Sequence, residues 1–243
     1  MPLILSLDTS TQICSVALAS EGKLLGTRES TDDKSHSRLL SVFIQELLSE
    51  NSLEASGLDA IAVSMGPGSY TGLRIGVSTA KGIAYGIDIH LIGISTLDAL
   101  VSGALQNKEI KSILAKESTT MLCPMIDARR MEVYTAVYSS SGKMTEDVSA
   151  SIIDENSYIK SLEKGKIVFF GNGAGKCMEK ITHPNAVFID SIETSAVYMV
   201  PLAEKSWKQK KFENVAYFEP FYLKDFIATI PKNKIIPGNR SET

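Results

Sequence analysis

Residues 3–24, LILSLDTSTQICSVALASEGKL, and residues 121–144, MLCPMIDARRMEVYTAVYSSSGKM, share one layout. Each begins with an apolar run that ends in an aspartate, turns into a second strand-like run, and closes with a glycine-containing hairpin signal. Asp8 precedes Ala17 by nine residues, and Asp127 precedes Ala136 by the same number. Because such self-similarity indicates a repeated structural unit, we predict that the chain contains two related lobes.

The residues that follow each of these stretches complete a β-β-β-α-β-α unit. In the first half we expect elements near residues 2–8, 12–20, 23–30, 37–50, 58–65, 70–86 and 90–94. Short strands, two acidic strand ends and a repeat together predict an α/β fold of the actin-like ATPase (ASKHA, ribonuclease-H-like) type with two duplicated lobes. We place the N-terminal lobe at residues 1–105, the C-terminal lobe at 106–230 and a flexible tail at 231–243.

The composition narrows the class of protein. The 243 residues are 44% hydrophobic and 22% charged, with a formal net charge of −3, as in an ordinary globular protein. This weak negative charge argues against a protein that grips RNA alone. No run of about 18 apolar residues suggests a membrane span, and the N-terminus lacks signal-peptide features. Three cysteines without a CxxC spacing predict neither a disulfide framework nor a zinc site, so we expect a cytoplasmic protein.

The two acidic strand ends could belong to a nucleotide site. In actin-like ATPases, the first aspartate holds a metal and the hydroxyl-rich turn after it faces phosphate. Asp8 and Ser10 occupy these positions here, but the sequence alone favours a strand end capped by small polar residues. We therefore treat them as vestigial nucleotide-binding positions and predict no bound cofactor.

The second acidic turn weakens the nucleotide interpretation. Asp127 is followed by Ala128, Arg129 and Arg130, where active members of the fold have a glycine-rich turn that approaches phosphate. The two arginines could meet an anion only through their side chains. The loop GNGAGK at residues 171–176 follows a strand, but its spacing is not that of a Walker A loop. We include Asp127, Gly171 and Gly173 among the vestigial nucleotide-binding positions, with an ordinary strand–helix turn as the alternative.

No catalytic or metal-binding set emerges from the remaining polar residues. The three histidines, His36, His90 and His183, are too far apart in sequence for a histidine-based metal motif. The serine in GPGSYTG lacks the GxSxG pattern of a nucleophile elbow. We predict no catalytic residues and no metal.

Small residues are concentrated in residues 64–86, SMGPGSYTGLRIGVSTAKGIAYG. The glycine spacing matches neither GxxxxGK[ST] nor GxGxxG, which argues against a phosphate loop. Gly72, Gly76, Ala80 and Ala84 recur every four residues and should lie on one side of a helix. Glycine in a helix costs up to about 1 kcal/mol relative to alanine, so the stripe indicates close packing. It fits either the protein's own sheet or a partner helix.

The helix expected at residues 37–50 carries more apolar residues than a narrow core-facing stripe needs. This surplus indicates contact on two sides, so we expect both helices to pack against helices of a partner. The predicted partner-binding residues are Leu39, Phe43, Leu47, Gly72, Arg74, Gly76, Val77 and Ala80.

The stretch SMGPGSYTGLRIGVSTAKGIAYG, followed by LIGISTLDAL, resembles the bacterial TsaB (YeaZ) family. Four further segments resemble the same family in the same order: LDTSTQICSVAL, KSHSRLL, IDARRMEVYTAVY and EPFYLKDF. The resemblance therefore covers nearly the whole chain.

This resemblance implies an actin-like fold and a non-catalytic role in making threonylcarbamoyladenosine on tRNA. Family members pair with the catalytic paralogue TsaD, which is assisted by the ATPase TsaE, or with a second copy when TsaD is absent. The resemblance implies contact with tRNA only through the complex, and no membrane partner. TsaD-like chains carry a histidine pair four residues apart, and the matching positions here are Thr96 and Leu100. Neither side chain replaces imidazole as a metal ligand.

Two enzymatic alternatives remain. One is a nucleotide-dependent actin-like ATPase or kinase that uses Asp8 and Asp127. Binding of ATP and magnesium with turnover by the isolated protein would favour it. The other is an M22-type metallopeptidase, which stoichiometric zinc or iron would support.

Overall fold

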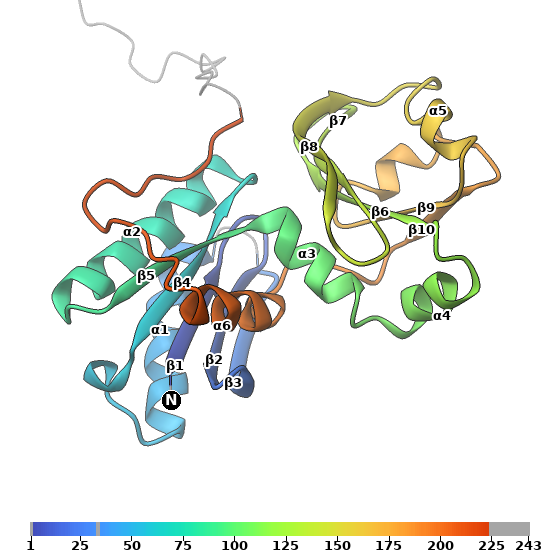
Figure 1. Ribbon diagram of the computed structural model, residues 1–243. Coiled ribbons are helices and arrows are strands. Elements are labelled where there is room, and N and C mark those ends of the chain that lie inside the picture. Colours follow the sequence, from blue (N-terminus) through green and yellow to red (C-terminus); the bar gives the residue numbers. More distant parts are fainter. Residues whose placement is uncertain (1, 33–34, 224–243) are drawn as a thin grey trace, which may run out of the picture.

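The computed structural model describes residues 2–32 and 35–223, and within them two five-stranded sheets share one topology (Figure 1). The first has the order β3-β2-β1-β4-β5, and the second has the order β8-β7-β6-β9-β10 when listed from the matching edge. The first-sheet strands are β1 (Leu3–Asp8), β2 (Cys14–Ser20), β3 (Lys23–Ser30), β4 (Ala60–Gly66) and β5 (His90–Ser95). The second-sheet strands are β6 (Met121–Asp127), β7 (Glu132–Tyr138), β8 (Met144–Ile152), β9 (Ile167–Phe170) and β10 (Ala186–Ile189).

The pairing of strands is also duplicated. The β1–β2 and β6–β7 pairs are antiparallel hairpins, whereas β1–β4 and β6–β9 are parallel. Asp8 and Asp127 occupy the last positions of β1 and β6 and lie opposite Ser15 and Val133. The predicted α/β ASKHA fold with two duplicated lobes is therefore confirmed.

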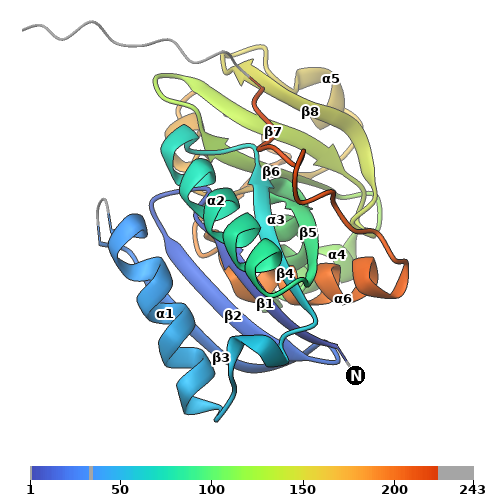
Figure 2. The same ribbon diagram turned by 90° about the vertical axis from the view of Figure 1, so that its left-hand side faces the viewer.

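Helices cover both faces of the first sheet. The helices α1 (His36–Glu50) and α2 (Tyr70–Gly86) lie side by side on one face (Figure 2). That face buries Leu5, Leu7 and Val16, whereas Ile4 and Ala17 point to the opposite face, as the alternation of a strand requires. The opposite face is covered by the 3-10 helix Ala196–Met199 and by α6 (Val200–Lys208).

The chain thus returns to the first lobe after completing the second sheet. Met199, Val200 and Ala203 are buried against the strands of the first sheet. We therefore keep our proposed boundary near residues 105 and 106 for the two sheets, but assign residues 196–208 to the first lobe. The predicted extent of the second lobe, 106–230, needs this correction because α6 fills a face that the first lobe leaves apolar. The tail at 231–243 lies outside the described residues.

The helix α3 (Thr96–Ala104) joins the two lobes (Figure 1). Its Leu97, Leu100 and Val101 enter the core of the second lobe, whereas Ala99 packs in the core beneath α6. The second lobe also contains α4 (Lys108–Lys116) and α5 (Ile159–Leu162), and short 3-10 helices lie at Ala55–Gly57 and Gly175–Cys177. Among the described residues, no helix has the length and apolar character needed to cross a membrane.

Candidate functional site: a helical face and two altered strand-end turns

The carboxylate of Asp8 is buried inside the first lobe. Its side chain is 1% exposed, and its Oδ1 accepts hydrogen bonds from Ser10 N at 2.9 Å and Ser10 Oγ at 2.6 Å. The other oxygen, Oδ2, has no hydrogen-bond partner. Desolvation raises the pKa of Asp8 above its usual value, although the bonds from Ser10 oppose the shift. One oxygen of this carboxylate is therefore used within its own turn, and the carboxylate is buried and not exposed in an open cleft.

The small-residue stripe of α2 packs against this same turn. Thr9 Oγ1 donates a hydrogen bond to Gly72 O at 2.7 Å. A Cβ atom at Gly72 would lie 2.0 Å from Thr9 O, and one at Gly76 would lie 2.3 Å from Thr9 Oγ1. The close approach that the stripe predicts is therefore made within the molecule, between α2 and the end of β1.

Five of the predicted partner-binding residues consequently face the protein's own core. These buried residues are Leu47, Gly72, Gly76, Val77 and Ala80. Leu47 is 0% exposed in the cluster that α1 and α2 share with the first sheet. The prediction needs correction at these positions, because the sheet and the Thr9 turn already occupy their surroundings. Leu39, Phe43 and Arg74 stay accessible and remain a prediction.

A different row of small residues on α2 faces outward. Ser78 is exposed, and a Cβ atom at Gly82 or Gly86 would meet no atom within 4 Å. These residues recur every four positions, as the buried row does, but on the solvent side of the helix. Tyr85 beside them is 84% exposed. The sequence contains this second row, but its spacing alone does not tell which row faces the sheet.

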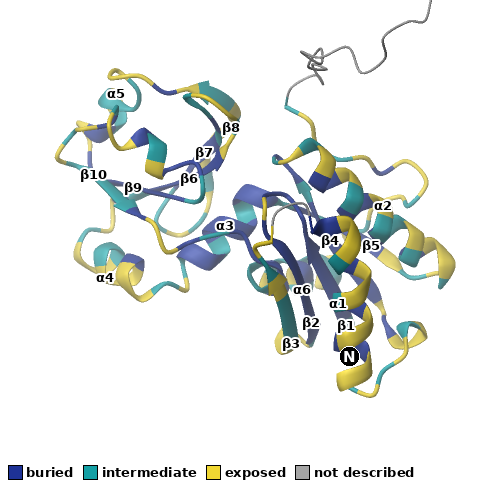
Figure 3. Ribbon diagram, turned by 180° about the vertical axis from the view of Figure 1, so that it is seen from behind, coloured by how far each residue is buried: buried dark blue, intermediate teal, exposed yellow. Residues whose placement is uncertain are grey.

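Apolar side chains of α1 are also exposed. Figure 3 shows exposed positions along α1 and α2. Val42 is 42% exposed, and Leu39 and Phe43 are partly exposed and pack against the edge of the core. We call the set Leu39, Val42, Phe43, Ser78, Gly82, Tyr85 and Gly86 the outer face. It is apolar and small in character and spans two adjacent helices, which suits packing by helices of another chain.

The last described residues cover one end of α2. Arg74 lies over the ring of Tyr70, with its guanidinium carbon 4.2 Å from the ring centroid, and donates from Nε to Tyr222 Oη at 3.2 Å. The backbone N–H of Phe221 donates to Met65 O at 2.7 Å. Arg74 is therefore held by the chain's own C-terminal segment at the rim of the outer face.

The second acidic turn, which follows Asp127, is also filled by groups of the same chain. Asp127 Oδ1 accepts a hydrogen bond from Arg129 N at 2.8 Å and one from the ammonium group of Lys176. Gly171 has φ +97°, and a Cβ atom there would lie 2.5 Å from Met125 O. At Gly173 a Cβ atom would lie 2.8 Å from the carbonyl carbon of Ile126. Both glycines thus allow their loop to pack against the end of β6, which supports the strand–helix turn alternative.

The positions that match the metal ligands of TsaD-like chains are part of the core. Thr96 Oγ1 and Ser64 Oγ share a buried hydrogen bond of 2.7 Å, and Leu100 is 1% exposed. In residues 2–32 and 35–223, no group of three or more His, Cys, Asp or Glu residues could hold a metal ion. Burial raises the pKa of Cys14 to about 11 and that of Cys123 to about 12, which leaves these thiols unreactive.

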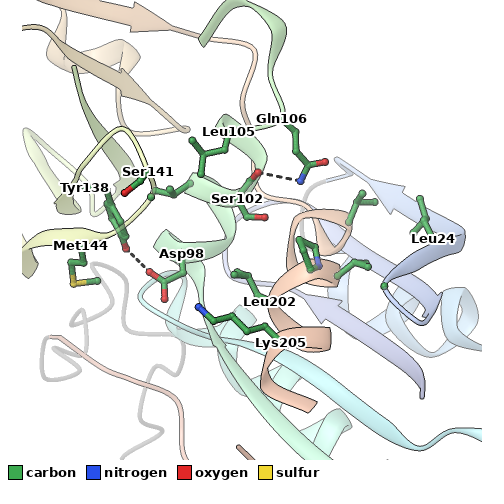
Figure 4. A pocket seen from close by; sticks show the side chains of 16 residues that line it. Leu24, Asp98, Ser102, Leu105, Gln106, Tyr138, Ser141, Met144, Leu202 and Lys205 are labelled. Atoms are coloured by element: carbon green, nitrogen blue, oxygen red, sulfur yellow. Dashed lines mark hydrogen bonds between the residues drawn. The ribbon is translucent and has the colours of Figure 1, made fainter. Parts of the chain in front are cut away.

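A pocket of about 760 Å³ lies between the two lobes (Figure 4). It is lined by α3, α6 and the hairpin turns β2–β3 and β7–β8, at the opposite end of the first sheet from Asp8. Tyr138 Oη donates to Asp98 Oδ1 at 2.6 Å across this boundary. Burial beside Asp98 raises the pKa of Tyr138, so the phenol keeps its proton and the link is maintained.

Comparisons with known proteins agree on one family. The profile of the family described as "TsaD: tRNA N6-adenosine threonylcarbamoyltransferase" matches residues 24–232. The chain is 31% identical to the tRNA threonylcarbamoyladenosine biosynthesis protein TsaB of Haemophilus influenzae, over 97% of both chains. It is also 31% identical to TsaB of Escherichia coli, over 97% of this chain and 98% of that one. The structure of YeaZ from Pseudomonas aeruginosa superposes with a TM-score of 0.76 at 27% identity, covering 92% of this chain and all of that one.

Proposed function

Because the chain belongs to the TsaB (YeaZ) family, we propose that it acts in tRNA threonylcarbamoyladenosine biosynthesis as a non-catalytic subunit. In this role it pairs with a TsaD-like catalytic paralogue, and it contacts tRNA only through the complex. When alone it pairs with a second copy of itself, and a TsaE-like ATPase acts on the assembled pair.

One observation carries the proposal: the outer face combines exposed apolar side chains with an uncovered row of small residues. Gly82 and Gly86 have open space where a side chain would project. Val42 of α1 and Tyr85 of α2 are exposed apolar and aromatic groups on the same two helices. A glycine row allows another helix to approach the backbone of α2 closely, and the larger side chains of α1 then add buried area at the edge.

The non-catalytic part of the proposal is supported by the two strand-end turns. Asp8 is turned inward, and the Asp127 turn is filled by a lysine of the same molecule. The positions of the metal-binding histidines hold Thr96 and Leu100 in the core. The chain thus keeps the framework of the fold, with Asp8 hydrogen-bonded to Ser10 and Asp127 paired with Lys176. Its contribution in this proposal is to hold the catalytic partner in an active shape.

Reconstitution of tRNA modification tests this proposal. The TsaD-like paralogue, a TsaE-like ATPase, threonylcarbamoyl adenylate and tRNA are combined with the wild-type chain, with Asp8→Asn or with Asp127→Asn. We expect modification to require the chain and to proceed with both variants, since neither carboxylate contacts a reacting group. The proposal would be contradicted if Asp8→Asn or Asp127→Asn formed the complex normally but did not support tRNA modification.

A further inference from the structure

The ammonium group of Lys176 is surrounded by oxygen atoms of the β6–β7 turn. It donates to Arg130 O at 2.7 Å, to Glu132 O at 2.7 Å and to Asp127 Oδ1. Lysine has three N–H donors, so these three oxygens use its full capacity. One carboxylate and two carbonyl oxygens form a ligand set of the kind that holds hard cations in proteins.

The turn brings these oxygens together at a conformational cost. Arg129 and Arg130 both adopt the left-handed region, with φ of 70° and 50°, which is unfavourable for residues other than glycine. The backbone N–H of Ala128 donates to Glu132 O at 3.1 Å, and that of Arg129 donates to the Asp127 carboxylate. Without a cation between them, the carbonyl oxygens of Arg130 and Glu132 and the carboxylate of Asp127 would repel one another.

A neighbouring lysine shows what an ordinary surface ion pair looks like in this lobe. Lys180 forms an ion pair with Glu155, and these side chains are 41% and 70% exposed. The side chain of Lys176 is 24% exposed and makes two main-chain contacts in addition to its ion pair. Lys176 is therefore integrated into the turn, whereas Lys180 belongs to a solvent-exposed ion pair with Glu155.

We infer that Lys176 is the built-in cation of the β6–β7 turn, and that its removal leaves a binding site for a free monovalent cation such as ammonium or potassium. The 2.7 Å contacts are longer than the 2.0–2.1 Å typical of magnesium and the 2.3–2.6 Å typical of calcium, so the oxygen set favours a larger ion. The inference rests on the contacts of the turn and does not depend on the proposed function.

Thermal unfolding of Lys176→Ala, with Lys180→Ala as the matched control, tests this inference. We expect Lys176→Ala to lower Tm more than Lys180→Ala in tetramethylammonium chloride. Ammonium or potassium chloride at equal ionic strength should restore most of that difference, while leaving the wild type and Lys180→Ala unchanged. Magnesium chloride should restore less. Lys176→Met fills the space with its side chain, so it should be destabilised without responding to ammonium.

Absence of an ammonium- or potassium-specific increase in the Tm of Lys176→Ala would overturn the inference, as would an equal increase in Lys176→Met. If Lys176→Ala does not fold in tetramethylammonium chloride, we expect its refolding yield to recover in ammonium chloride. Failure to recover there, with normal refolding of Lys180→Ala, would equally overturn it.

Discussion

At the scale of single residues, Asp8 shows how a carboxylate at the end of a strand is built into a core. Its burial and its bonds to Ser10 leave one carboxylate oxygen without a partner. Desolvation disfavours the charged form, so the folded protein holds the Asp8 proton more tightly than the unfolded chain does. The free energy of unfolding contributed by Asp8 is therefore highest below the unfolded pKa of about 3.9, and falls as the pH rises through the folded pKa.

We predict that Asp8→Asn becomes more stable relative to wild type as the pH rises from 3 toward 7. The amide can still accept from Ser10 but carries no charge to desolvate. The gain should be about 1.4 kcal/mol for each unit by which folding raises the pKa of Asp8. Urea unfolding of both proteins across this pH range measures it. A difference in free energy of unfolding that is the same at every pH would contradict the prediction.

At the scale of elements, the strands and helices follow from patterns within short segments. Apolar runs predict β1 and β4, and the four-residue spacing of small residues predicts α2, because neighbours in sequence decide these structures. Which side of α2 faces inward depends on Thr9, which lies 63 residues before Gly72. Two rows of small residues satisfy the same helical period, so the sequence alone could not choose between them.

The two rows should respond oppositely to an added methyl group. Gly72→Ala would place Cβ against Thr9 O and should lower the free energy of unfolding by about 1–3 kcal/mol, since the backbone must move. Gly82→Ala meets open space and should raise it by up to about 1 kcal/mol, since alanine favours the helix. Urea unfolding of the two variants measures both effects. Equal changes in the same direction would mean that the rows are assigned to the wrong sides.

At the scale of the whole molecule, the duplication could be predicted from residues 3–24 and 121–144, because matching strand–turn–strand patterns build matching sheets. The return of the chain to the first lobe could not be predicted from the sequence. Residues 196–208 pack on β1 and β5, two strands that lie far away in the sequence. The apolar pattern of residues 196–208 would suit either lobe. The candidate site could be predicted only in part for the same reason. The sequence identifies α1 and α2 as helices, but which side of each helix faces the sheet depends on contacts with residues far away in the sequence.

This return makes the first lobe dependent on the C-terminal segment. A fragment of residues 1–105 would expose Ile4, Ala62 and Ile92, which α6 and its preceding turn cover in the full chain. We predict that this fragment does not unfold cooperatively, and that fusing residues 190–223 to it through a flexible linker restores cooperative unfolding. Circular dichroism during heating measures both. A cooperative transition for residues 1–105 alone would show that the first lobe is complete without this segment.

The central claim is that the outer face of α1 and α2 binds the catalytic paralogue. Isothermal titration of a TsaD-like protein with Gly82→Gln tests it most directly, with Gly57→Gln as a matched control, because a Cβ atom at either glycine meets no atom within 4 Å. We predict that Gly82→Gln weakens binding at least about tenfold, equivalent to about 1.4 kcal/mol, while Gly57→Gln binds as the wild type does. Wild-type affinity in a folded Gly82→Gln variant would contradict this claim.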